Sequence, residues 1–114
     1  RGLDVEAFTA ESFVAVCAEA TEPHHHEHVT PYYHEQAERF ERVSVTSGEV
    51  FDEEWLHERT DLRLTLDEPA DYELLRRVYA EVAHDGLLDV RDAIRHIDEH
   101  GLDELNAHVE QKET

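Results

Sequence analysis

The fold is predicted most directly by residues 62–75, which are Leu62-Arg63-Leu64-Thr65-Leu66-Asp67-Glu68-Pro69-Ala70-Asp71-Tyr72-Glu73-Leu74-Leu75. Leu62, Leu64 and Leu66 alternate with more polar residues, a spacing that places the three leucines on one face of a β-strand. Pro69 fits the first position of a helix, where its missing N–H costs nothing. Asp67 lies between the two, at the carboxyl end of the predicted strand, where ligands bind in open α/β sheets. The stretch therefore predicts a strand, a carboxylate at its tip, and a helix.

Further elements are expected along the rest of the chain. Alternating apolar residues predict strands at residues 3–8 and 40–46, and a loop with one helical turn is expected at 47–61. Helices are expected after Thr9, from Pro31, from Pro69 to the break at residues 84–86, from Asp89 to Gly101, and in a short final turn. The predicted fold class is α/β, with about three strands and flanking helices.

The net charge is the most unusual feature of the composition. Twenty-nine Asp and Glu face ten Lys and Arg, which gives −19. The acidic residues are dispersed over amphipathic segments, which is typical of a solvated folded surface. We interpret the charge as adaptation to a salty, halophile-like cytoplasm, where salt screens self-repulsion. An acidic mimic of nucleic acid is the alternative, whereas direct nucleic-acid binding is not expected because it needs clustered Lys and Arg.

The sequence predicts a cytoplasmic protein that does not bind membranes. No apolar run approaches the roughly 20 residues that span a bilayer, and no signal peptide is visible. Cys17 is the single cysteine, so an internal disulfide cannot form. Cys17 lies in the predicted apolar stripe of the first helix, with Phe13, Val16 and Ala20, and is expected to be buried.

Four segments together resemble one enzyme family. They are Gly2-Leu3-Asp4-Val5-Glu6-Ala7-Phe8, Glu27-His28-Val29-Thr30-Pro31-Tyr32-Tyr33, Leu64-Thr65-Leu66-Asp67-Glu68-Pro69-Ala70-Asp71 and Leu105-Asn106-Ala107-His108-Val109-Glu110-Gln111-Lys112. The first three are similar to the "GLDVEVF", "EHVTPYI" and "TVDTPED" segments of sugar cytidylyltransferases. That family includes acylneuraminate and 3-deoxy-manno-octulosonate cytidylyltransferases and the spore coat polysaccharide biosynthesis protein F group. The segments follow the family's order over nearly the whole chain.

The resemblance implies a fold and an activity. Residues 1–114 would be a single partial domain, the carboxyl-terminal portion of a Rossmann-like nucleotide-diphospho-sugar transferase domain. The complete enzyme would transfer CMP from CTP to a sugar, an acidic one by resemblance, and release pyrophosphate for polysaccharide or surface glycan synthesis. The family's glycine-containing nucleotide loop has no counterpart here, so the chain alone is expected to be inactive. A homodimer is also expected by resemblance.

Asp67 is the predicted metal ligand. In the family the matching Asp helps to hold a divalent ion, and magnesium prefers one or two carboxylates plus water and phosphate oxygens. The cofactor implied by the resemblance is therefore Mg²⁺. Some relatives carry a second Asp at the position of Thr65, and its absence removes one ligand. The alternative is that Asp67 only caps the helix that begins at Pro69.

Asp4, Glu6, Glu27 and His28 are the predicted residues of the sugar side. Asp4 and Glu6 share one face of the first predicted strand and could accept hydrogen bonds from sugar hydroxyls. They could equally be the solvated face of an edge strand. By resemblance, the loop that holds Glu27 and His28 approaches the sugar or a partner subunit, although His26 stands where the family has Arg. The alternative is a loop held only by Thr30 and Pro31.

A different class of protein remains open. The run His24-His25-His26-Glu27-His28, the negative surface and the missing nucleotide loop are also compatible with a non-catalytic, acidic, His-rich interaction or metal-binding module. Imidazoles are good transition-metal ligands, but adjacent side chains on an extended loop diverge, and no spaced zinc motif is present. Whether this run binds a metal is left open. A third possibility keeps the enzyme fold but transfers a glycosyl group.

Overall fold

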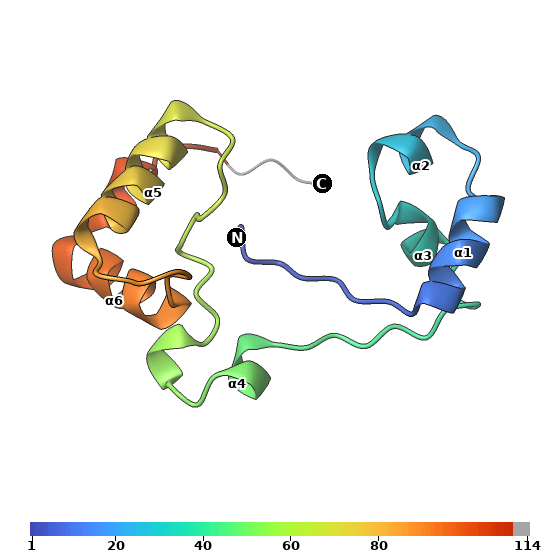
Figure 1. Ribbon diagram of the computed structural model, residues 1–114, viewed down its shortest axis with the longest axis horizontal. Helices are drawn as coiled ribbons and strands as arrows, with labels where there is room; N and C mark the ends of the chain where they lie inside the picture. Colours follow the sequence, from blue (N-terminus) through green and yellow to red (C-terminus); the bar gives the residue numbers. More distant parts are fainter. Residues whose placement is uncertain (111–114) are drawn as a thin grey trace. The chain divides into compact units, whose positions relative to one another are not determined.

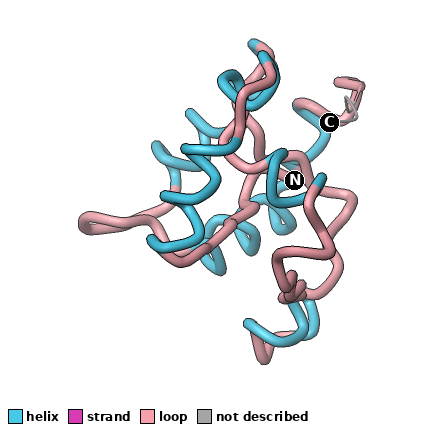
Figure 2. Tube along the Cα trace, turned by 90° about the vertical axis from the view of Figure 1, so that its right-hand side faces the viewer, coloured by secondary structure: helices cyan, strands magenta, loops and turns pink. Residues whose placement is uncertain are grey.

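The computed structural model describes residues 1–110, and these residues form helices joined by irregular segments (Figures 1 and 2). No β-strand occurs within this described part of the chain, so the predicted α/β class with about three strands is wrong. The predicted strand segments, residues 3–8, 40–46 and 62–66, have no regular secondary structure. Alternation of apolar residues favours an extended backbone, but a strand also needs a neighbouring strand that satisfies its N–H and C=O groups.

The apolar faces expected for the strands are not buried. Val5 is 89% exposed, Val43 79% and Val45 68%. Leu66 is 63% exposed, although Leu62 is buried. The alternating pattern therefore does not correspond to one inward face in any of the three segments, because no sheet forms to cover it.

Contacts divide the chain into two compact units, which are described separately. The first unit comprises Arg1–Asp4 and Thr46–Thr114, and the second comprises Val5–Val45. None of the helices within residues 1–110 combines the length and apolar character needed to cross a bilayer.

Up to residue 110, the first unit contains five helical elements. They are α4 (Ser47–Val50), the 3-10 turn η1 (Glu54–Leu56), α5 (Pro69–Glu81), α6 (Val90–His100) and the 3-10 turn η2 (Leu102–Leu105). Their apolar residues surround one core, made of Leu56, Leu62, Leu74, Val78, Ile94, Ile97 and Leu102. Leu74 and Ile97 are fully buried, so α5 and α6 each turn an apolar face toward this core, although Tyr79 of α5 is exposed.

The ends of α5 and α6 follow local signals in the sequence. Pro69 is the first residue of α5, as predicted. The side chain of Asp89 caps α6 by accepting a hydrogen bond from the Arg91 N–H at 2.8 Å. Gly101 ends α6 with φ 63°, the left-handed conformation expected for a glycine just past a helix.

The second unit contains α1 (Ala10–Glu19), α2 (Pro23–Glu27) and α3 (Pro31–Glu35). The Thr9 hydroxyl caps α1 by accepting a hydrogen bond from the Ser12 N–H at 3.1 Å, as predicted. Stacked and tilted rings join Phe8, Phe13, Tyr33 and Phe40, with neighbouring centroids 4.8–5.2 Å apart.

Burial of Cys17 was predicted wrongly. Of the apolar stripe expected on α1, only Val16 is buried, and Cys17 is exposed. A 41-residue unit built from three short helices has little interior, so it buries one side of α1 incompletely.

Candidate functional site

A buried carboxylate organises the segment that the sequence singled out. Asp71 lies in the first turn of α5 and is fully buried. The Arg63 guanidinium donates to it with two nearly parallel hydrogen bonds, from Nε to Oδ1 at 2.8 Å and from Nη2 to Oδ2 at 2.9 Å. This bidentate geometry is the strongest form of an arginine–carboxylate pair.

Further donors surround the same carboxylate. Its Oδ2 accepts hydrogen bonds from the backbone N–H groups of Asp67 and Glu68, at 3.0 and 3.1 Å, and from the Thr65 hydroxyl at 3.3 Å. Its Oδ1 accepts a hydrogen bond from the Asn106 side-chain amide at 2.9 Å. The Arg63 guanidinium, followed by these other donors, holds the pKa of Asp71 well below its usual range. Asp71 therefore stays ionised and fixes the turn before α5.

The backbone N–H of Asp67 is bound by Asp71, whereas the Asp67 carboxylate is exposed to solvent. Its side chain is 71% exposed, and its Oδ2 lies 3.6 Å from Arg63 Nη2. No strand leads into Asp67, so the strand-tip argument for a metal site does not hold. The alternative, a helix cap, is not its role either, because Glu68 is the N-cap residue of α5. Metal binding by Asp67 stays a prediction that depends on the family resemblance.

Three of the four family-like segments meet in the first unit. The Arg1 amino group donates to the Leu62 carbonyl at 3.0 Å, and the Leu64 N–H donates to the Arg1 carbonyl at 2.8 Å. Gly2 has φ +100°, and a Cβ added to it would lie 2.3 Å from the Leu64 backbone. Only glycine fits this close approach. Asn106 joins from the other end of the chain through its bond to Asp71 and a 2.8 Å bond to the Arg63 carbonyl.

Glu6 connects the first and second family-like segments in the second unit. The Thr30 hydroxyl donates to Glu6 Oε1 at 2.8 Å, and His34 Nε2 lies 3.2 Å from Oε2. The hydrogen bond from Thr30, followed by that from His34, lowers the pKa of Glu6 from its ordinary value. This carboxylate is thus engaged within the protein, and its proposed contact with a sugar stays a prediction.

The other residues predicted for the sugar side are exposed. Asp4 belongs to the first unit, whereas Glu6 belongs to the second. Glu27 and His28 follow each other at the end of α2, with side chains 76% and 65% exposed and a closest N–O distance of 4.0 Å. Glu27 and His28 are neighbours in the sequence, so their proximity says nothing about a site. Sugar binding by Asp4, Glu27 and His28 stays a prediction.

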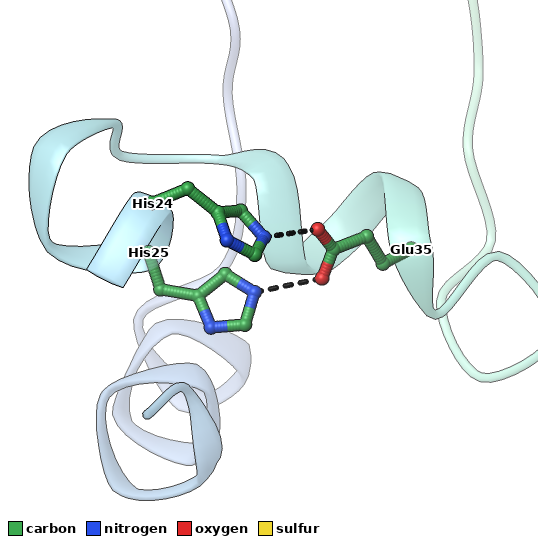
Figure 3. Close-up of side chains that lie close together, drawn as sticks. All are labelled: His24, His25 and Glu35. Carbon is green, nitrogen blue, oxygen red and sulfur yellow. Dashed lines mark hydrogen bonds and ion pairs between the residues drawn. The ribbon is translucent and has the colours of Figure 1, made fainter. Parts of the chain in front are cut away.

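A second cluster, which the sequence did not predict, joins α2 to α3. His24 Nε2 lies 2.5 Å from Glu35 Oε1, and His25 Nε2 lies 2.7 Å from Glu35 Oε2 (Figure 3). Contacts with His25 and then His24 lower the pKa of Glu35. The run of histidines was the sequence feature from which such a cluster could have been predicted. The loop was expected to be extended, but residues 23–27 form a helical turn, from which both rings reach one carboxylate.

Comparisons with family models, with curated proteins and with solved structures found no match to this chain. The resemblance to sugar cytidylyltransferases therefore stays a prediction from the sequence.

Proposed function

We propose that this chain contributes part of a nucleotidyltransferase that moves CMP from CTP to an acidic sugar and releases pyrophosphate. The observation that supports the proposal most strongly is that the family-like segments pair within each unit. The third segment meets the first and the fourth in the first unit, and the first meets the second in the second unit. Asn106 joins the last segment to the third, Arg1 and Gly2 adjoin the third, and Glu6 joins the first to the second.

The pattern of contacts supports the resemblance because it involves the residues that carry it. Asp71, Asn106, Gly2, Glu6 and Thr30 all belong to the matching segments. Segments that match a family by chance have no reason to meet through a buried hydrogen bond from Asn106 to Asp71 and a glycine-only approach at Gly2. The same contacts give the matching residues a structural role, which accounts for their occurrence together in one chain.

Asp67 is the residue proposed to hold Mg²⁺. Asp71 fixes its backbone N–H, while its own carboxylate is exposed beside Arg63. Because Asp71 already neutralises Arg63, the group of three charges carries a net negative charge that favours a cation. When bound, the ion would offset charge on phosphate oxygens during transfer. Asp67 would supply one oxygen ligand, and water and phosphate would supply the others.

The nucleotide would be bound by residues outside this sequence. No segment of the 114 residues resembles the family's nucleotide loop. The proposal therefore predicts that the isolated chain releases no pyrophosphate from CTP.

The test compares two aspartate variants in the protein encoded by the complete natural gene. With CTP, Mg²⁺ and a panel of acidic sugars, we expect pyrophosphate release that falls by about 100-fold or more in Asp67→Asn, because a metal ligand is lost. Asp85→Asn is the matched control, since Asp85 is also an exposed aspartate of the first unit. Absence of CTP-dependent release with every sugar would overturn the proposed function. Full activity in Asp67→Asn would overturn only the role of Asp67.

A further inference from the structure

We propose that His24, His25 and Glu35 bind one divalent transition-metal ion of the zinc type. Each residue offers one ligand atom, and these atoms all lie within 4.8 Å of one another (Figure 3). Two donors that each lie about 2.1 Å from a tetrahedral zinc ion are roughly 3.4 Å apart. The three ligand atoms are thus close enough to share one ion, and the two short contacts to Glu35 would lengthen by about 1 Å through movement of the exposed His24 and Glu35 side chains.

The surrounding residues preorganise one ligand and leave the others accessible. The His25 side chain is 6% exposed, and its ring packs edge-on against Tyr32 at a centroid distance of 5.3 Å. The side chains of His24 and Glu35 are 48% and 43% exposed. A buried inner ligand with two exposed outer ligands gives an ion both a defined position and a route of entry.

The donor set favours zinc over magnesium. Two imidazoles and one carboxylate match the ligands of three-residue zinc sites, which keep a fourth position for water, whereas Mg²⁺ and Ca²⁺ prefer oxygen ligands. The second unit also holds eight glutamates and two arginines, so its field attracts cations. The site is separate from the Mg²⁺ role proposed for Asp67 in the first unit, and neither depends on the other.

Binding requires one identifiable change of hydrogen bonding. The Glu22 N–H donates to His25 Nδ1 at 3.2 Å, which places the neutral ring's proton on Nε2. A ring that binds zinc through Nε2 carries its proton on Nδ1 instead. The Glu22 hydrogen bond must therefore break, and its exposed N–H must turn to water. The Glu22 amide is thus a reporter of this binding mode.

The test is calorimetric titration of the 114-residue chain with Zn²⁺. We expect one equivalent to bind with a dissociation constant that rises at least about tenfold in His24→Ala and in Glu35→Gln, because each removes one ligand. His26→Ala and Glu38→Gln are matched controls, since they change exposed residues of the same kinds in the same unit and should leave binding unchanged. His24 is half exposed, so its replacement leaves the core of the unit intact, and circular dichroism checks this.

Amide NMR spectra give a second readout. We expect Zn²⁺ to shift the Glu22 amide and a 100-fold excess of Mg²⁺ to leave it in place. The proposal is overturned if no zinc binds, or if His26→Ala weakens binding as much as His24→Ala, which would indicate unspecific binding by the chain's histidines. A Glu22 amide that does not respond to bound zinc would also overturn it. None of these outcomes depends on CTP turnover.

Discussion

Replacing Asp71 by asparagine keeps the size of the side chain while it removes a buried negative charge. In the native unit Oδ2 accepts four hydrogen bonds and Oδ1 accepts two, of which one on each oxygen comes from Arg63. An asparagine oxygen can take the place of Oδ2. Its amide nitrogen then stands at Oδ1 and points its hydrogens at the donors of Arg63 and Asn106.

The expected loss of stability follows from these contacts. Two hydrogen bonds to a charged group are lost, each worth about 1.5–3 kcal/mol. The Arg63 side chain, which is 8% exposed, loses the buried carboxylate that it binds with two hydrogen bonds. Removing one member of a buried ion pair costs about 3–5 kcal/mol, which overlaps the roughly 3–6 kcal/mol that the two hydrogen bonds give together. A unit of about 70 residues is stable by only roughly 4–10 kcal/mol, so much of its stability depends on Asp71.

Urea unfolding followed by tryptophan fluorescence measures this effect. Trp55 is the single tryptophan and belongs to the first unit, so its emission reports on the unit that contains Asp71. With a slope of about 1.5 kcal/mol per molar urea, the midpoint should fall by about 2–3 M at constant slope. Glu73→Gln breaks the exposed Glu73–Arg76 pair and serves as the control, with no measurable change expected. A midpoint shift below about 0.5 M in Asp71→Asn would refute the structural role of the buried pair.

Three further predictions concern stability. Because the pKa of Asp71 is lowered on folding, the unfolded state takes up its proton first, so the stability that Asp71 contributes is complete above about pH 5 and decreases as the pH falls. Urea titrations should show the difference between wild type and Asp71→Asn shrinking by about 1 kcal/mol at pH 3, and a constant difference would contradict the pairing. The net charge of −19 predicts a midpoint that rises between about 0.1 and 3 M KCl as repulsion is screened, and a flat or falling midpoint would count against the halophilic interpretation. Gly101→Ala should cost about 1 kcal/mol because Gly101 has φ 63°, whereas Gly48→Ala, in a helix with its new Cβ 3.8 Å from His57, should stabilise by about 0.4–1 kcal/mol. Equal effects of the two glycine changes would show that the left-handed conformation is not the cause.

The helices of the fold could be predicted because their signals are local. Thr9, Pro31, Pro69, Asp89 and Gly101 each mark a helix end through chemistry that involves only the nearest turn. Helical spacing of apolar residues accounts for the buried Leu74 and Val78 of α5 and Ile94 and Ile97 of α6, whereas Tyr79 at the same spacing is exposed. All five ends agree with the structure to within a residue.

The prediction of three strands was wrong because strand pairing is not local. Leu62, Leu64 and Leu66 alternate as a strand requires, yet no sheet forms in residues 1–110 to pair with them. Leu66 remains exposed. Arg63, expected on the polar face, is instead buried, where it pairs with Asp71. A polar residue between leucines can therefore indicate a buried ion pair as well as an outward face.

The candidate sites also depend on contacts between distant residues. Asp71 accepts a hydrogen bond from the N–H of Glu68, the N-cap residue of α5, which is a local contact. Its pairing with Arg63 and Asn106 spans up to 35 residues, and the meeting of His24 and His25 with Glu35 joins two helices. Neither contact could be predicted from periodicity or spacing, because each requires the folded arrangement of separate elements.

The most direct test of the proposed function is mass spectrometry of the products formed by the protein of the complete natural gene. With CTP, Mg²⁺ and an acidic sugar, we predict a CMP-sugar and pyrophosphate in equal amounts, and none when the other three nucleoside triphosphates replace CTP. A folded protein that forms no CMP-sugar from any acidic sugar, or that transfers a glycosyl group from a nucleotide sugar instead, would contradict the proposal.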